Sequence, residues 1–181
     1  MRINFELDED IQLKQLQSSD ASPLYSLINS NREHLNEWFV WVNKTQSPQD
    51  GNTFISSTIE KYEKTKALEC GIWYKHQLVG VIGMRYVDMT LKSTEIGYWL
   101  GESFEGKGIM TKSVKRMLAY AFKELQLHKV EIRCAEGNRR SQAVAERLNF
   151  VKEAMLRDNG YINGRYHNQL VYSLLENEYE G

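Results

Sequence analysis

The chain has 181 residues, of which 41% are hydrophobic and 26% charged, and its formal net charge is −1. These values are typical of one globular domain over residues 1–181, and they exclude a disordered or low-complexity chain. The near-zero charge gives no overall attraction to nucleic acid or to an anionic membrane, so neither is an expected partner.

The first third of the chain is predicted to hold a strand region and two helices. Residues 2–16 alternate loosely between apolar and polar side chains, which is typical of a strand or hairpin. Apolar residues recur at helical spacing over 21–36, and Ser47-Pro48 begins a second helix. Neither a signal-peptide pattern nor an apolar run of membrane-spanning length stands out, so a cytoplasmic protein is expected.

The rest of the chain alternates between strands and helices. Strands are predicted at 69–74, 77–84 and 94–100. The later elements are an amphipathic helix after a glycine-rich turn at 101–108, a strand at 130–134, a helix at 139–148, and strands at 150–154 and 170–175, with turns at Asn159-Gly160 and Asn163-Gly164. Neighbouring strands predict hairpins, and the two strand–helix–strand passages predict parallel pairing. The predicted fold class is α/β with a mixed sheet.

The glycine-rich turn at 101–111 is the most informative segment. It lies between a predicted strand and a predicted helix, and it contains Gly106 and Gly108. Glycines let the backbone approach a ligand closely, and the first N–H groups of a helix attract anions. The turn therefore predicts a cradle for a phosphate or pyrophosphate, with a simple tight turn as the competing interpretation.

Two other motif readings of this turn are weaker. Residues 101–107 spell GxxxxGK, but Gly108 occupies the position where a P-loop needs Ser or Thr for Mg²⁺, which disfavours a nucleotide switch. A nucleophile elbow also fails, because the GxS at 101–103 has no second glycine in register. Cys70 and Cys134 lack metal-ligand spacing, so we expect no metal and a reducing compartment.

The turn is similar to a known cofactor loop. Residues 105–110 resemble the Q/R-x-x-G-x-G/A loop with which GNAT acetyltransferases bind the pyrophosphate of acetyl-CoA. The segment departs from that pattern with Glu105 in place of Gln or Arg and Met110 in place of Gly or Ala. Since such a loop works through backbone N–H groups, these side-chain changes are compatible with its function.

Four further segments resemble the ribosomal-protein acetyltransferase branch of that family, in the same order along the chain. They are residues 31–42, 95–100, 138–150 and 164–175, with Asn149 and Asn168 replacing the usual glycine and aspartate. The resemblance covers nearly the whole chain. It implies the GNAT fold, a mixed and mostly antiparallel sheet flanked by about four helices, with a splayed parallel strand pair holding acetyl-CoA.

The resemblance also implies which residues hold acetyl-CoA. Backbone groups of Trp99, Leu100 and Gly101 are expected to pair with the pantetheine arm. The pyrophosphate contacts are expected from Gly106, Gly108, Ile109, Met110 and Thr111, and the outer phosphates from Lys107, Lys112 and Arg139. Asn138 and Ser141 are expected to flank the thioester. A solvated charge is the competing interpretation for each basic residue, and a helix cap for Asn138.

Acetyl transfer requires a base for the amine and a proton for the leaving thiolate. Glu95 is the first candidate for the base, because it lies on the strand that borders the expected cleft; an exposed strand charge is the alternative. Ala145 replaces the tyrosine that protonates the thiolate in many GNAT enzymes, so Ser141 is the expected substitute. An α-amine, with a pKa of about 7.7–8.0 against about 10.4 for lysine, demands less of its base.

The acceptor is less well specified. His34, Trp38, Trp41 and Arg85 are candidate substrate-binding residues, with core or surface roles as the competing interpretations. The expected partner is the N-terminus of a ribosomal protein. The alternatives are a small amine such as a polyamine or an aminoglycoside, or a non-catalytic acetyl-CoA sensor. The chain is also a candidate homo-oligomer through the aromatic segment 38–42. For Cys134, a packing role is favoured over a nucleophile.

Overall fold

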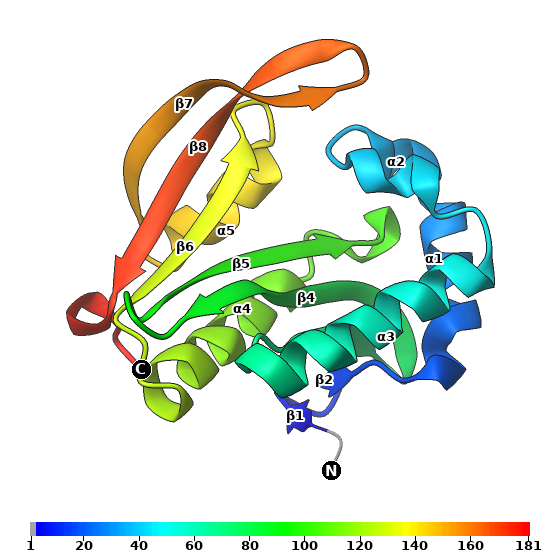
Figure 1. Cartoon of the computed structure of the whole chain (residues 1–181), viewed down its shortest axis with the longest axis horizontal. Coiled ribbons are helices and arrows are strands. Elements are labelled where there is room, and N and C mark those ends of the chain that lie inside the picture. The colour runs from blue at the N-terminus through cyan, green and yellow to red at the C-terminus, as the bar shows by residue number, and fades with distance from the viewer. Residues whose placement is uncertain (1–2) are drawn as a thin grey trace.

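The computed structural model describes residues 3–181, which form an eight-stranded sheet in the order β1-β2-β3-β4-β5-β6-β8-β7 (Figure 1). Its strands are β1 (Asn4–Glu6), β2 (Ile11–Gln15), β3 (Glu69–Tyr74), β4 (Gln77–Asp88), β5 (Ser93–Leu100), β6 (Lys129–Ala135), β7 (Val151–Ile162) and β8 (Arg165–Leu175). Every neighbouring pair is antiparallel except β5 and β6. The predicted α/β class with a mixed, mostly antiparallel sheet is confirmed.

The second predicted parallel pair is wrong, because β8 lies between β6 and β7 and is antiparallel to both. The burial of the two strands explains the order. Residues 170–174 of β8 are all buried, whereas β7 has no buried residue and occupies the sheet edge. The apolar strand therefore takes the inner position, and the polar strand takes the position beside solvent.

The turn of this last hairpin is at Asn163-Gly164, as predicted. Both residues have positive φ, 51° and 78°, which suits a tight hairpin turn. The second predicted turn, Asn159-Gly160, is wrong. These residues lie within β7, where the register with β8 shifts between Leu156 and Gly160. At this irregularity the positive φ, 51°, belongs to Asp158 and not to the Asn-Gly pair, so the strand bends without turning back.

The described residues 3–181 contain five α-helices: α1 (Ala21–Ser30), α2 (Arg32–Asn36), α3 (Pro48–Thr65), α4 (Ile109–Ala119) and α5 (Arg139–Arg147). The helix expected over 21–36 is two helices, because Asn31 leaves the helical conformation with φ −118° and ψ 20°. Its amide donates to the Leu27 carbonyl and accepts from the Glu102 N–H, both at 2.9 Å. Asn31 therefore ties the start of α2 to the glycine-rich turn.

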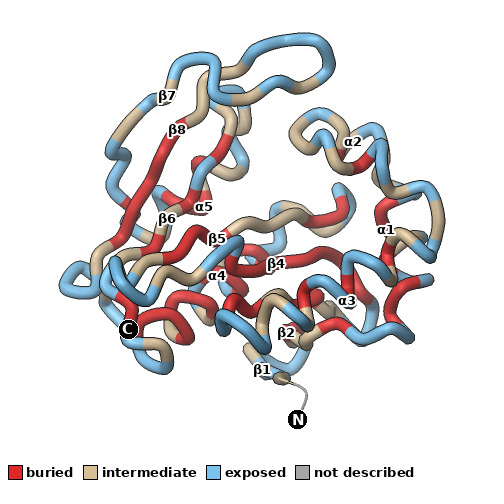
Figure 2. The backbone as a smooth tube through the Cα atoms, in the orientation of Figure 1, coloured by how far each residue is buried: buried red, intermediate tan, exposed pale blue. Residues whose placement is uncertain are grey.

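The helices form two layers, with α1 and α3 on one face of the sheet and α4 and α5 on the other (Figure 1). Each layer has its own buried cluster. Ile96 and Leu100 of β5 belong to the α4 cluster, and Trp99 packs against the α1–α3 cluster. Burial is concentrated in the central strands, whereas the tip of the β7–β8 hairpin is exposed (Figure 2). Successive β5 side chains thus point to opposite layers, as expected for a strand.

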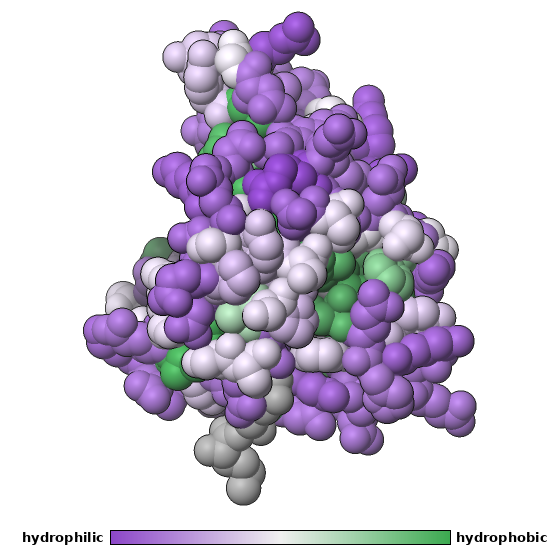
Figure 3. Space-filling view, turned by 90° about the vertical axis from the view of Figure 1, so that its right-hand side faces the viewer, coloured by the Kyte–Doolittle hydropathy of each residue, from purple (hydrophilic) through white to green (hydrophobic). Residues whose placement is uncertain are grey.

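Helix length and surface hydropathy are the two features that would indicate contact with a membrane. No helix within residues 3–181 is long and apolar enough to cross one. The side of the molecule shown in Figure 3 is mainly hydrophilic, with apolar residues visible in small separate areas.

The sheet opens between β5 and β6. These strands pair only through Ser93, Thr94 and Glu95 with residues 129–131, while β5 stays paired with β4 as far as Leu100. The edge of β5 from Ile96 onward therefore faces a gap between diverging strands. The predicted splayed parallel pair is confirmed, and it positions the site.

Candidate active site

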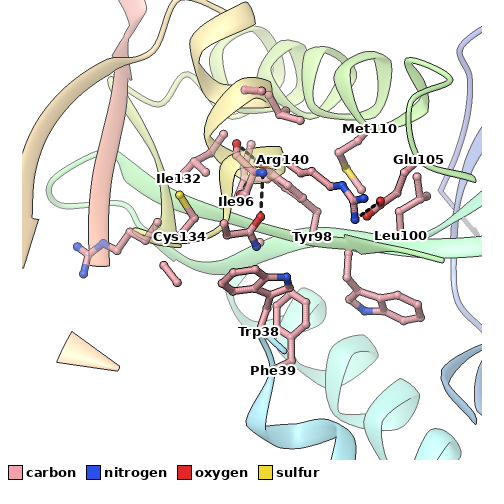
Figure 4. A pocket seen from close by; sticks show the side chains of 18 of the residues that line it. Trp38, Phe39, Ile96, Tyr98, Leu100, Glu105, Met110, Ile132, Cys134 and Arg140 are labelled. Carbon is pink, nitrogen blue, oxygen red and sulfur yellow. Dashed lines mark hydrogen bonds and ion pairs between the residues drawn. The ribbon is translucent and has the colours of Figure 1, made fainter. Parts of the chain in front are cut away.

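A cavity of about 830 Å³ lies where β5 and β6 part (Figure 4). At one end it is lined by the start of α4, and at the other by α2 and the β7–β8 hairpin. Its volume is within the usual range for a small-molecule site. Because the cavity passes through the opening in the sheet, residues from both faces of β5 reach it.

The α4 end of the cavity is built from backbone. Gly106 and Gly108 have φ values of 74° and 73°, and a Cβ on either would meet nothing within 4 Å. Ile109, Met110 and Thr111 begin α4, so their N–H groups have no carbonyl one turn earlier in the helix to bond. All five residues line the cavity. This open, N–H-rich cradle fits a pyrophosphate.

Basic side chains surround this cradle. Lys112, Arg140 and Arg147 line the cavity, and the last two were not predicted. Arg147 donates to the Thr111 hydroxyl at 2.9 Å, and Lys112 pairs with Asp8 at 2.6 Å. The predicted Arg139 does not line the cavity and bonds Gln142 instead. Helical spacing alone could not show which of the arginines at 139, 140 and 147 faces α4.

Three predicted residues lie beside the cavity rather than on its wall. The Gly101 N–H donates to the Val79 carbonyl at 2.8 Å, so it is not free for a ligand. Lys107 lies over the rings of Phe104 and Tyr74. The Trp41 ring packs against Trp99, 5.8 Å between centroids. Trp99 and Leu100 do line the cavity.

Asn138 and Ser141 meet at the middle of the cavity, at the start of α5. The Asn138 side chain accepts from the Ser141 N–H at 3.0 Å, so it caps α5 while also lining the cavity. The Tyr98 hydroxyl lies 3.1 Å from the Ser141 hydroxyl and 3.2 Å from its carbonyl oxygen. The Ser141 hydroxyl also hydrogen-bonds the Cys134 thiol. Three hydroxyl and thiol groups thus meet at one point.

The Tyr98 hydroxyl is kept protonated by its surroundings. Burial raises its pKa far above the ordinary tyrosine value. Burial likewise raises the pKa of Cys134, which keeps it a thiol and disfavours a nucleophilic role. The sequence analysis missed Tyr98. Its position three residues after Glu95 on β5 places it on the opposite face of the strand, toward α5.

Glu95 occupies the other end of the open strand edge. Its side chain is only 9% exposed, so the exposed-strand alternative is wrong. Arg85 on β4 contacts one carboxylate oxygen at 3.2 Å, and Arg133 on β6 approaches the other at 3.6 Å. Burial raises the pKa of Glu95, and the two arginines oppose that rise. A carboxylate with a raised pKa facing a cavity is a good base near neutral pH.

The α2 helix closes this end of the cavity together with the hairpin. His34, Trp38 and Phe39 line it, and His34 Nε2 contacts the Glu105 carboxylate at 3.1 Å. Asn163 at the hairpin tip donates to the Asn36 carbonyl at 2.9 Å, bridging the hairpin and α2.

Glu105 also pairs with Arg140 across the cavity at 2.6 Å (Figure 4). The residue that departs from the family's loop pattern therefore links α2, the loop and α5. Several lining residues from the sheet and hairpin were not predicted, namely Arg133, Gly160 and Ile162. Only the strand order brings them here.

Comparisons with known proteins agree with this geometry. Residues 10–151 match the family model for the acetyltransferase (GNAT) domain. Bacillus subtilis YdaF, named as a candidate ribosomal N-acetyltransferase, is 36% identical over 97% of each chain.

Two solved structures are also similar over nearly the whole chain. One is RimL, a ribosomal L7/L12 alpha-N-protein acetyltransferase with coenzyme A in disulfide to a cysteine, at a TM-score of 0.92, 25% identity and coverage of 96% and 98%. The other is the microcin C7 self-immunity acetyltransferase MccE with acetyl-CoA and AMP, at 0.89, 30% identity and coverage of 93% and 94%.

Proposed function

This chain belongs to the GNAT acetyltransferase family, and on that premise we propose that it acetylates the N-terminal α-amine of a protein, with ribosomal proteins as the first candidates. Family membership confirms the predicted acetyl-CoA-dependent enzyme. The observation that carries the proposal is the single cavity joining the glycine cradle to Glu95 through the opening in the sheet. We further propose that residues 1–181 act as one domain.

The acceptor end favours an N-terminus over a polyamine. Among the described residues that line the cavity, the carboxylates are Glu95 and Glu105, and each is already paired with arginine: Glu95 with Arg85 and Arg133, and Glu105 with Arg140. A polyamine brings several positive charges, which Arg85 and Arg133 would repel. A peptide N-terminus brings one amine, and its α-amine loses its proton more readily than a lysine. The names of YdaF and RimL support the same choice.

In the proposed arrangement acetyl-CoA supplies an activated thioester, with its pyrophosphate at Gly106–Thr111 and its pantetheine along the open edge of β5. The sulfur would lie near Ser141 and Cys134, an assignment supported by the coenzyme A–cysteine disulfide of RimL. The cradle holds the phosphates through N–H groups and the nearby basic side chains. Backbone N–H near Trp99 is the proposed donor to the oxyanion.

In the proposed reaction Glu95 accepts the proton of the amine, and Ser141 supplies the proton of the leaving thiolate. The amine nitrogen attacks the thioester carbonyl, the N–C bond forms, and Glu95 accepts the amine proton directly or through one water. The C–S bond breaks, and the thiolate takes a proton through the Ser141 hydroxyl, which regains one from bound water. Tyr98 orients that hydroxyl through its own hydrogen bond. The proton that Glu95 accepted passes to solvent, so both residues return to their starting states. The amide and the free thiol leave, so no acyl-enzyme forms.

The test is thiol release from acetyl-CoA by the purified chain. The acceptors are peptides that begin with Ser or Ala, spermidine, and an aminoglycoside. Turnover of a peptide, with loss in Glu95→Gln, supports the proposal. Turnover of small amines alone would move the assignment to a metabolite or drug acetyltransferase. Tight acetyl-CoA binding without any turnover would favour a sensor, and absence of binding would contradict the cofactor cradle.

A further inference from the structure

A β-bulge directs Arg85 into the cavity. Met84 pairs with Ile96 and Val87 with Thr94, so Arg85 and Tyr86 together oppose the single residue Glu95. A bulge of this kind turns a side chain away from its regular direction, and such bulges are frequent beside active sites. Arg85 thus has a position that regular pairing of β4 and β5 would not give it.

The Arg85 side chain runs past Gly97 on the neighbouring strand. A Cβ at Gly97 would lie at ordinary contact distance from the arginine stem, 3.6 Å from Cγ and 3.7 Å from Cδ, so the stem lies along β5. Its guanidinium contacts Glu95 at 3.2 Å, yet the Arg85 side chain as a whole is 67% exposed. Among residues 3–181 its one hydrogen bond is to Glu95, which leaves several N–H groups directed at solvent.

Arg133, the second arginine beside Glu95, is less exposed than Arg85 and is paired with two carboxylates. Arg133 is 33% exposed, and its guanidinium is bound by Glu131 at 2.7 Å as well as by Glu95. The positive charge of Arg133 is therefore largely neutralised by the carboxylates of neighbouring strands. Arg85 is the cation at this end that remains available to a ligand.

We propose that Arg85 selects acceptors that carry a carboxylate beside the amine, which for a protein N-terminus means Asp or Glu as the second residue. This rests on the proposed function. An amine that reaches Glu95 brings the following residue within reach of the Arg85 guanidinium. A carboxylate there can form a charge-assisted, two-pronged bond with it, whereas lysine or arginine is repelled.

The experiment compares peptides that begin with Ser and differ only at the second residue, which is Asp, the isosteric Asn, or Lys. For the unaltered chain we expect kcat/KM to fall about tenfold from Asp to Asn and again from Asn to Lys, with smaller differences at high salt. Arg85→Gln should bring the three values together. Arg85→Glu should reverse the order, so that Lys becomes the preferred second residue.

Arg157→Gln is the matched control, because Arg157 is exposed and does not line the cavity. It should keep the original order. Acetyl-CoA binding by both Arg85 variants confirms that they are folded. Acetylation of all three peptides at similar rates, or an unchanged order in Arg85→Glu, would overturn the role of Arg85 alone. If no peptide is acetylated while small amines are, the proposed function and this inference both fail.

Discussion

The two ends of the cavity are built in different ways. The cofactor end is one continuous segment, residues 106–111, whose function lies in backbone N–H groups and two glycines of positive φ. The acceptor end is assembled from side chains far apart in the chain, among them His34, Arg85, Glu95 and Arg133. Only the sheet brings these together.

This difference separates what is common to the family from what is particular to this chain. A backbone cradle tolerates side-chain change, which explains why Glu105 and Met110 leave its geometry intact. An acceptor site made of charged side chains changes its preference with a single substitution. The following variants test whether the two ends are as independent as their construction indicates.

The largest effect is expected at the cradle. Gly108→Val forces a β-branched residue into positive φ and places its side chain where the pyrophosphate would lie. Acetyl-CoA affinity, measured by calorimetry, should fall at least about 100-fold, since the cradle supplies most of the anion contacts. Gly164→Val is the control, because Gly164 also has positive φ and open space but lies at the hairpin tip. Equal loss of binding in both would point to misfolding instead.

The next effect concerns the proposed base at the other end. Glu95→Gln keeps the size of the side chain but removes its ability to accept the amine proton, so kcat should fall about 10²–10⁴-fold. Acetyl-CoA affinity should remain within about twofold, if the two ends are independent. Glu69→Gln, which removes another ion-paired strand carboxylate, should leave kcat nearly unchanged. An active Glu95→Gln enzyme would require another base.

Ser141 and Tyr98 lie between the two ends and should show smaller effects. Ser141→Ala removes the proposed proton donor and should lower kcat about 100-fold. Tyr98→Phe removes only the bond that orients it, so about a tenfold loss is expected. Exposed Ser57→Ala is the control. If Tyr98→Phe costs more than Ser141→Ala, the tyrosine itself would be the proton donor.

The same contrast explains what could be predicted from the sequence. The glycine turn between β5 and α4 and the order of the strands follow from contiguous patterns, and they were predicted correctly. Gly160 and Ile162 of the hairpin were missed because β8 inserts between β6 and β7, an order that follows from the burial of residues 170–174. Tyr98 was missed because its importance comes from Ser141, 43 residues away. A pattern of neighbouring residues in the sequence cannot predict a hydrogen-bond partner that only tertiary packing brings close.

A pH profile sharpens the description of the acceptor end. The pKa of Glu95 is raised by burial and by Glu131, and it is lowered by Arg85 and Arg133. Arg85→Gln removes one of the lowering charges, so the pKa should rise further. Because the base form exists above this pKa, the acidic limb of kcat/KM should move to higher pH. The assay uses the Ser-Asn peptide, and Arg157→Gln should not move the limb. A shift to lower pH would contradict the proposed role of Glu95.

The smallest effect is expected where the hairpin meets α2. Asn163→Gly keeps the positive φ of the turn, 51°, but removes the hydrogen bond to the Asn36 carbonyl. A net hydrogen bond is worth about 0.5–1.5 kcal/mol, so KM for the peptide should rise by no more than about tenfold. Acetyl-CoA affinity should not change, because this bond lies at the acceptor end. Asn149→Gly, at another positive-φ asparagine, is the control. If Asn163→Gly weakens acetyl-CoA binding instead, then α2 carries the change through His34 to Glu105 in the cofactor loop, and the two ends are coupled.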